Sequence, residues 1–191
     1  MRILRLLLIG GLLLSGFAVA SAITYTEGAT ATGTLGNTSF TNASLVFTFT
    51  GNTSNVTGGV GFFSIVATGA TLRINGGGAI TITDSGIRVA VNQGFAPPAA
   101  GFGGAQGSIL DTLDNAFGTY ALVTAIGPIT DTSFIRPDLT FATSSGGLNI
   151  TSAGNSTFTA TTTPEPATLM TLGAGLLAFG AHRYRQTIRR S

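Results

Sequence analysis

Few side chains in this sequence could perform chemistry, and most of those that could are carboxylates. The chain has no cysteine and a single histidine, His182, close to its C-terminus. A thiol nucleophile, a Ser-His-Asp triad and a zinc site of the usual kind all need residues that the rest of the chain lacks. The sequence therefore predicts no cofactor and no enzyme of these classes.

Two neighbouring acids, Asp111 and Asp114, are the candidate metal ligands. Three positions apart on a helix, they would share a face and, with Asn115, could offer oxygen atoms to calcium. The D-x-[DN]-x-[DN]-G spacing of a calcium loop is absent from the sequence. Acids in the first turn of a helix are also favoured by the helix dipole without any ion. We predict no metal site and keep these two acids as the remaining candidates.

A second use of carboxylates is a glycosidase-like pair, which needs two of them on either side of a sugar bond. Any two of Asp84, Asp131 and Asp138 could supply such a pair. The sequence cannot bring them together in space, so this enzyme reading ranks last and we predict a protein that is not an enzyme.

Asparagine offers one further kind of chemistry, the attachment of glycans. Each Asn-x-Ser/Thr sequon could accept a glycan, although many arise by composition alone where Asn, Ser and Thr are common, so both readings stay open. The six sequons lie at Asn37, Asn42, Asn52, Asn55, Asn149 and Asn155.

The N-terminus has the three parts of a secretory signal peptide. Arg2 and Arg5 form a positive region, residues 6–19 are apolar, and Ala20 and Ala22 place small residues at the −3 and −1 positions of a cleavage site. We predict that signal peptidase removes residues 1–22 and that the exported chain begins near Ile23.

The C-terminus combines a stiff motif, an apolar run and a basic tail. Pro164, Glu165 and Pro166 cannot continue a regular helix backward and so mark an extended, accessible boundary. The apolar run 167–181 would cover about 22 Å as a helix, short of the ~30 Å hydrocarbon core. A buried helix is the alternative, but the basic flank favours a membrane span with its tail in the cytoplasm. That flank consists of Arg183, Arg185, Arg189 and Arg190.

In this order, the three parts of residues 164–191 resemble the PEP-CTERM sorting signal of exported and surface proteins of Gram-negative bacteria. The resemblance implies export through the inner membrane, anchoring by the C-terminal helix, and processing by an exosortase-like enzyme that leaves the protein at the cell surface or outside the cell. It also implies an association with exopolysaccharide and the biofilm matrix.

Charge excludes nucleic acid as a partner of the exported part. The chain has nine basic residues, all arginines, and only Arg73, Arg88 and Arg136 fall between residues 23 and 163, where acids outnumber them. Binding to phosphates needs a basic patch, and this mildly acidic stretch offers none in its composition.

Period-2 patterns predict an all-β domain, an antiparallel sandwich or jelly-roll-like fold, over residues 23–154. Strands are expected at 44–50, 61–68, 71–74, 80–83, 87–91, 119–125, 138–143, 147–152 and 157–161. The runs 80–83 and 87–91 read as a hairpin closed by Asp84, Ser85 and Gly86, with their isoleucines and valines buried.

Three segments depart from this strand pattern. Residues 94–107 form a Gly/Pro-rich loop whose Phe95 and Phe102 we expect to enter the core. Residues 108–117 fit a short helix capped by Ser108. Residues 155–163 form a threonine-rich stretch that, beyond its last strand, serves as an extended spacer before the sorting signal.

These features predict an exported structural or adhesive surface protein. A carbohydrate-binding module is the alternative, which would show an aromatic platform on one sheet face. Against it, the chain has no Trp, and the exported part has only Tyr25 and Tyr120 as tyrosines.

Overall fold

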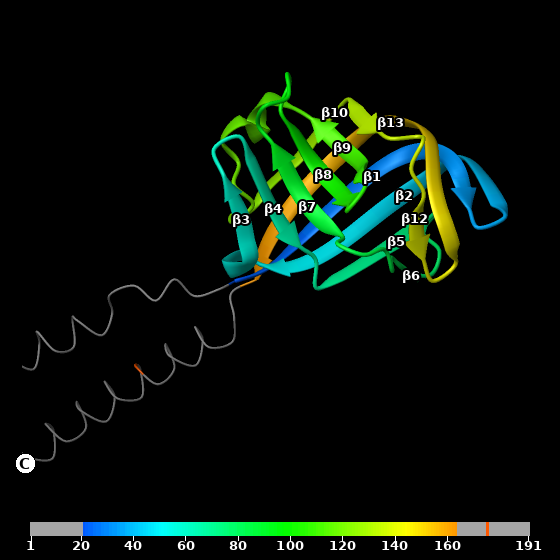
Figure 1. Cartoon of the computed structure of the whole chain (residues 1–191), viewed down its shortest axis with the longest axis horizontal. Coiled ribbons are helices and arrows are strands. Elements are labelled where there is room, and N and C mark those ends of the chain that lie inside the picture. The colour runs from blue at the N-terminus through cyan, green and yellow to red at the C-terminus, as the bar shows by residue number, and fades with distance from the viewer. Residues whose placement is uncertain (1–20, 164–174, 176–191) are drawn as a thin grey trace, which may run out of the picture. The chain divides into compact units, whose positions relative to one another are not determined.

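The computed structural model describes residues 21–163 and the single residue 175. Residues 21–163 lie in one compact unit made of two antiparallel sheets, with one sheet in front of the other in Figure 1. This arrangement confirms the predicted all-β class and its sandwich form. Within the described residues, no helix is long and apolar enough to cross a membrane. The predicted membrane helix 167–181 lies outside the described residues, apart from position 175.

The first sheet is built around the two ends of the domain. Its order is β10-β13-β1-β2-β5-β6, and β12 also pairs with β13. These strands are β10 (Ile126–Asp131), β13 (Gly146–Thr163), β1 (Ala22–Leu35), β2 (Thr38–Asn52), β5 (Gly69–Ile74), β6 (Ile80–Thr81) and β12 (Phe141–Thr143). Because β1 and β13 are neighbours, Ala22 lies opposite Thr163.

The second sheet has the order β11-β9-β8-β7-β4-β3. Its strands are β11 (Ser133–Ile135), β9 (Gly107–Leu113), β8 (Ala99–Gly104), β7 (Arg88–Asn92), β4 (Phe62–Val66) and β3 (Val56–Gly59). Two short 3₁₀ helices, η1 (Thr53–Asn55) and η2 (Asn115–Thr119), complete the described elements.

Alternating large residues fill the space between the sheets. Leu45, Phe47 and Phe49 of β2 are fully buried, as their spacing predicts. Phe49 stacks on Phe102 of β8 with ring centroids 3.7 Å apart, so this contact joins the two sheets. Each such side chain contributes about 1.5–3 kcal/mol by leaving water.

The predicted hairpin over residues 80–91 is wrong, although its buried face is right. β6 pairs with β5 in the first sheet, whereas β7 pairs with β4 and β8 in the second. The segment between them crosses from one sheet to the other, and the Asp84 carboxylate accepts a hydrogen bond from the Ala142 amide of β12. Ile82 and Ile87 are buried on either side of this crossing.

The predicted helix over 108–117 is also wrong. Residues 107–113 form strand β9, which is paired with β8 on one side and β11 on the other. The helical turn η2 begins only after this strand, and the Asp114 carboxylate caps it by accepting a hydrogen bond from the Ala116 amide. Pairing on both edges outweighs the local helical spacing.

The strand expected at 119–125 is instead the end of η2 followed by a loop. Its apolar residues Tyr120 and Leu122 are nevertheless buried. The Tyr25 hydroxyl donates to the Leu122 carbonyl at 2.7 Å, which fixes this loop against β1. The next strand, β10, begins at Ile126.

The strand expected at 157–161 is confirmed as part of β13, but the spacer assigned to residues 155–163 is wrong. β13 continues without interruption to Thr163 and pairs with β1 up to that residue. Phe158 of this segment is fully buried and contacts four other aromatic rings. The folded domain therefore extends to residue 163 and includes the stretch assigned to a linker.

Candidate functional site

A groove of about 430 Å³ lies on the second sheet, and strand β8 forms its floor. Phe102 of β8 points into the core, so its neighbours Gly101 and Gly103 lie on the outer side of the strand. A Cβ atom on Gly101 would collide with the Leu110 carbonyl, and one on Gly103 with the Gly107 carbonyl. The close approach of β8 and β9 thus requires glycine here, and it leaves the floor low between bulkier neighbours.

Three phenylalanines stand around this floor. Phe62 comes from β4, Phe134 from β11 and Phe95 from the turn before β8. Phe62 and Phe95 expose 44% and 46% of their surface, and the rings of Phe95 and Phe134 are 6.0 Å apart. Phe102 enters the core as predicted, but Phe95 does not, because it stands at the rim of the groove.

The groove also has a charged lining. Arg88 projects from β7, where Val89 and Val91 take the inward positions, and Arg136 follows β11. Arg136 binds Asp138 through both carboxylate oxygens, at 3.0 and 2.8 Å. Arg88 donates through Nε to the Gly86 carbonyl at 3.3 Å and forms no salt bridge within the described residues.

Among residues 21–163, Asp111 is the one acid that lines the groove. It lies on β9 opposite Gly101 of β8 and Phe134 of β11. Burial raises the pKa of this carboxyl to about 7, although a hydrogen bond with the Ser108 side chain acts in the opposite direction. Asp111 is therefore only partly ionised at neutral pH.

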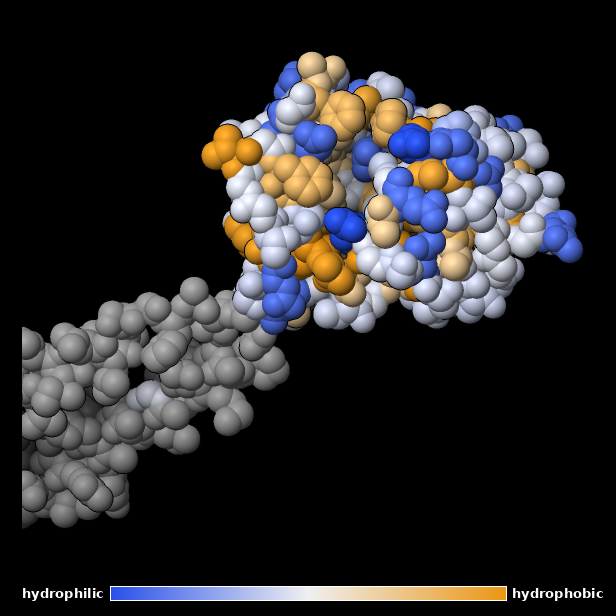
Figure 2. Space-filling view, viewed as in Figure 1, coloured by the Kyte–Doolittle hydropathy of each residue, from blue (hydrophilic) through white to orange (hydrophobic). Residues whose placement is uncertain are grey.

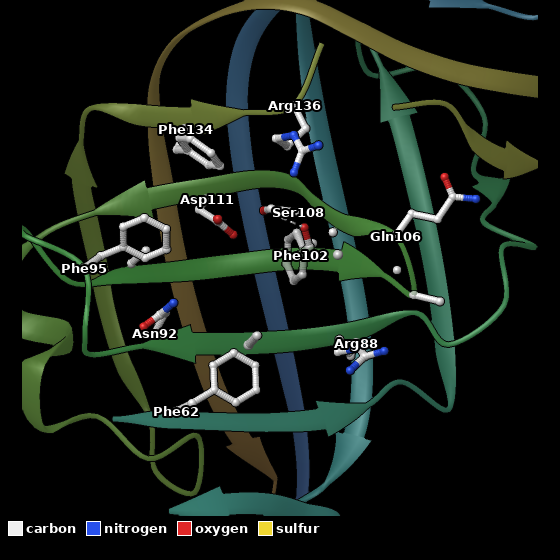
Figure 3. Close-up of a pocket in the computed structure, with 16 residues that line it drawn as sticks. Phe62, Arg88, Asn92, Phe95, Phe102, Gln106, Ser108, Asp111, Phe134 and Arg136 are labelled. Atoms are coloured by element: carbon white, nitrogen blue, oxygen red, sulfur yellow. Dashed lines mark hydrogen bonds between the residues drawn. The ribbon is translucent and has the colours of Figure 1, made fainter. Parts of the chain in front are cut away.

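Two of the phenylalanines and the two arginines occupy different ends of the groove (Figure 3). Phe95 and Phe134 lie at one end, whereas Arg88 and Arg136 lie toward the other, on opposite sides of β8. Figure 2 shows the same face of the domain, where apolar patches and strongly hydrophilic ones surround a hollow. Such a mixture of ring surfaces and a few directed polar groups is typical of sites that bind small ligands.

A buried polar cluster lies behind the groove, between the sheets. Glu27 of β1 is fully buried and accepts a hydrogen bond from the Thr112 hydroxyl at 2.8 Å through Oε1. Thr112 also shares a hydrogen bond with Ser156 of β13. Glu27 Oε2 has no partner among the described residues. Burial, and secondarily the charge of Asp111, raise the pKa of Glu27 well above its ordinary value.

The structure separates the two acids proposed as metal ligands. Asp111 faces the groove from a strand, whereas Asp114 caps η2. Across the part of the chain that is described, no three His, Cys, Asp or Glu side chains lie close enough to hold a metal ion.

The three acids considered for a glycosidase pair have separate tasks. Asp84 accepts a hydrogen bond from the Ala142 amide and lines a second cavity of about 280 Å³. Asp131 accepts a hydrogen bond from the Thr132 amide. Asp138 forms a salt bridge with Arg136. None of them lines the groove on β8.

The groove was not predicted, because the aromatic platform was expected to consist of Trp or Tyr, and its rings are phenylalanines. Tyr25 and Tyr120 are buried, and burial raises the pKa of both hydroxyls. The usable signal was the outward positions of the strands: Phe62 alternates with partly buried Phe63 and buried Ile65, and Arg88 with buried Val89 and Val91.

The sorting residues Pro164, Glu165 and Pro166 and the arginines after residue 182 lie outside the described residues, as does Ala20. Ala22, in contrast, is the first residue of β1. Residues 162–185 match a known protein family, the PEP-CTERM protein-sorting motif. The chain carries a PEP-CTERM sorting signal. The match covers the Pro-Glu-Pro motif, the apolar run, Arg183 and Arg185, and it begins while β13 is still paired with β1.

This PEP-CTERM motif implies export, anchoring in a membrane and processing by an exosortase. Its first two matched residues, Thr162 and Thr163, are the last two of β13. No curated protein and no solved structure matches the chain.

Proposed function

We propose that the chain is an exported surface protein whose β-sandwich has a structural or adhesive role outside the cell, in contact with extracellular polysaccharide or the biofilm matrix. Signal peptidase removes residues 1–22, the helix 167–181 holds the precursor in the membrane with its arginines in the cytoplasm, and an exosortase then processes the Pro-Glu-Pro region. The match of residues 162–185 to the PEP-CTERM motif carries this proposal.

The two ends of the domain lie close together, beside both proposed processing sites. Ala22 lies opposite Thr163 in adjacent strands, so the two proposed processing sites flank the same end of the sandwich. The Ser21 amide also donates to Thr53 Oγ1, and the Thr53 amide returns a bond to the Ser21 carbonyl. Both proposed processing sites therefore lie at one end of the domain, whereas the groove is formed by strands of the second sheet.

Replacing Pro164, Glu165 and Pro166 together with alanine tests the proposal. The triple variant should accumulate in the membrane as unprocessed precursor, because the exosortase no longer recognises its site, while the sandwich remains folded and resistant to protease. A chain that ends at Thr163 should be exported and soluble. Cell fractionation with immunoblotting measures both results. Normal processing of the triple-alanine variant would contradict the sorting proposal.

A carbohydrate-binding module is the second candidate, and the groove on β8 favours it. Its three phenylalanines supply the aromatic surface that the tyrosines do not. An enzyme is the least favoured reading, since only one acid lines the groove and glycoside hydrolysis ordinarily needs two. Binding of glycans without any release of reducing sugar would separate these two candidates.

A further inference from the structure

The distribution of arginine on the domain points to the charge of the ligand. Residues 21–163 contain three arginines, Arg73, Arg88 and Arg136, and the last two both line the groove on β8. Acids outnumber arginines in this part of the chain. A mildly acidic domain that places two of its three cations in one groove is suited to a ligand with negative charge.

The two guanidinium groups are not equally available. Arg136 is engaged by Asp138, which offsets its charge. Arg88 has a backbone carbonyl as its single hydrogen-bond partner within the described residues, so its remaining N–H donors can bind a ligand. The planar fork of a guanidinium matches a carboxylate, with two parallel hydrogen bonds. Asp111 opposes this attraction only in part, since its pKa of about 7 leaves it partly neutral.

The rest of the groove suits a ring-shaped ligand rather than a peptide strand. The groove lies on the face of the sheet, where β8 is already paired with β7 and β9, so its backbone cannot pair with an added strand. Recognition must come from side chains. Exposed Phe62 and Phe95 offer flat apolar surfaces, and Asn92 and Gln106 offer amides for hydroxyl groups.

We propose that this groove binds a segment of an acidic polysaccharide, with a sugar carboxylate on Arg88 and the C–H faces of the sugar rings against Phe62 and Phe95. The proposal rests on the proposed role at the cell surface and names the chemical class of the ligand at this site. It extends the carbohydrate-binding alternative by assigning the residues and by requiring a carboxylate.

Oligogalacturonate, a chain of carboxylated sugars, is the probe, titrated by calorimetry into the full chain in detergent. We expect saturable binding that weakens at least about tenfold in Arg88→Gln and in Phe62→Ala, because each removes one half of the contact. The matched controls are Arg73→Gln, an exposed arginine on β5 of the other sheet, and Val123→Ala, an exposed apolar residue outside the groove. Both should bind like the unmodified chain.

The methyl ester of the same oligosaccharide keeps the rings but loses the charge, and it should bind at least about tenfold more weakly. Equal binding of acid and ester would overturn the carboxylate contact. No saturable binding, equal loss in Arg73→Gln and Arg88→Gln, or equal binding of a polyglutamate peptide would overturn the proposal. Fractionation of cells that produce Arg88→Gln keeps the sorting question separate: that variant should be processed normally whichever ligand the groove binds.

Discussion

Glu27 is a buried acid whose protonation affects the stability of the domain. Its carboxyl is fully buried, and one oxygen has no partner among residues 21–163. In the unfolded chain it ionises near its ordinary pKa of 4.5, whereas burial makes the folded chain keep the proton to a much higher pH. Folding therefore takes up a proton in this window, and stability falls as the pH rises from about 4.5 toward the raised pKa of the folded state.

Glu27→Gln should remove the share of this dependence that Glu27 contributes, since the amide keeps an acceptor for Thr112 but cannot ionise, whereas Asp111 with its pKa of about 7 keeps its own share. Each of the two buried acids, Glu27 and Asp111, contributes up to about 1.4 kcal/mol per pH unit to the slope of unfolding free energy against pH. Urea unfolding between pH 4.5 and 8 measures it. Asp138→Asn is the control, because that exposed acid has a lowered pKa and should leave the slope unchanged. An unchanged slope in Glu27→Gln would show that Glu27 is ionised in the folded domain.

Asp111 should make binding in the groove depend on pH. With a pKa of about 7, it is largely neutral at pH 6 and ionised at pH 8, where it repels an anionic sugar. The ionisable groups around it are Arg88 and Arg136 in the groove and Glu27 behind the sheet. Oligogalacturonate affinity should fall about fivefold from pH 6 to pH 8 and stay constant in Asp111→Asn. A persistent pH dependence in that variant would assign the effect to another group.

At the scale of elements, β13 shows most clearly what the sequence leaves open. Alternation identified the buried positions on several strands, such as Phe47 on β2 and Val89 on β7. It could not identify partners, because either edge of a strand can pair with any other, and so the pairing of β6 and β7 was wrong. Threonine-rich residues 155–163 were expected to end in a spacer, yet β1 pairs with them through Thr163. In both cases, β6 with β7 and residues 155–163, pairing with strands distant in the sequence determined the structure, and the local sequence pattern did not.

Two truncated chains test whether residues 155–163 act as a strand of the sandwich or as a spacer. A chain ending at Thr163 should fold, since the whole of β13 remains. A chain ending at Gly154 loses the segment that holds Phe158 in the core, and the loss of a buried Phe alone costs about 3–5 kcal/mol. Thermal melts followed by circular dichroism should show a cooperative transition for the first chain and none for the second. Equal melting temperatures would mean that the C-terminal half of β13 does not stabilise the sandwich.

For the whole molecule, the proposed signal peptide precedes the β-sandwich and the PEP-CTERM motif follows it, and residues 22 and 163 lie opposite each other in adjacent strands. The composition predicted the all-β fold class, and the two terminal segments predicted export. Both predictions depend only on residue types and their order along the chain. The groove could not be predicted in the same way, since it depends on β4, β7, β8, β9 and β11 lying side by side. Phe62 and Arg136 are far apart in sequence, and only the sheet order brings them to one site.

The most direct test of the sorting account is the intact mass of the mature protein recovered from the producing cell's surface or medium, with both termini sequenced. The account predicts a chain that begins at Ile23 and ends at or near residues 164–166, without the apolar run and the arginine tail. One spectrum thus reports both processing events. A surface protein that still begins at Met1, or that retains all residues to Ser191, would contradict the account.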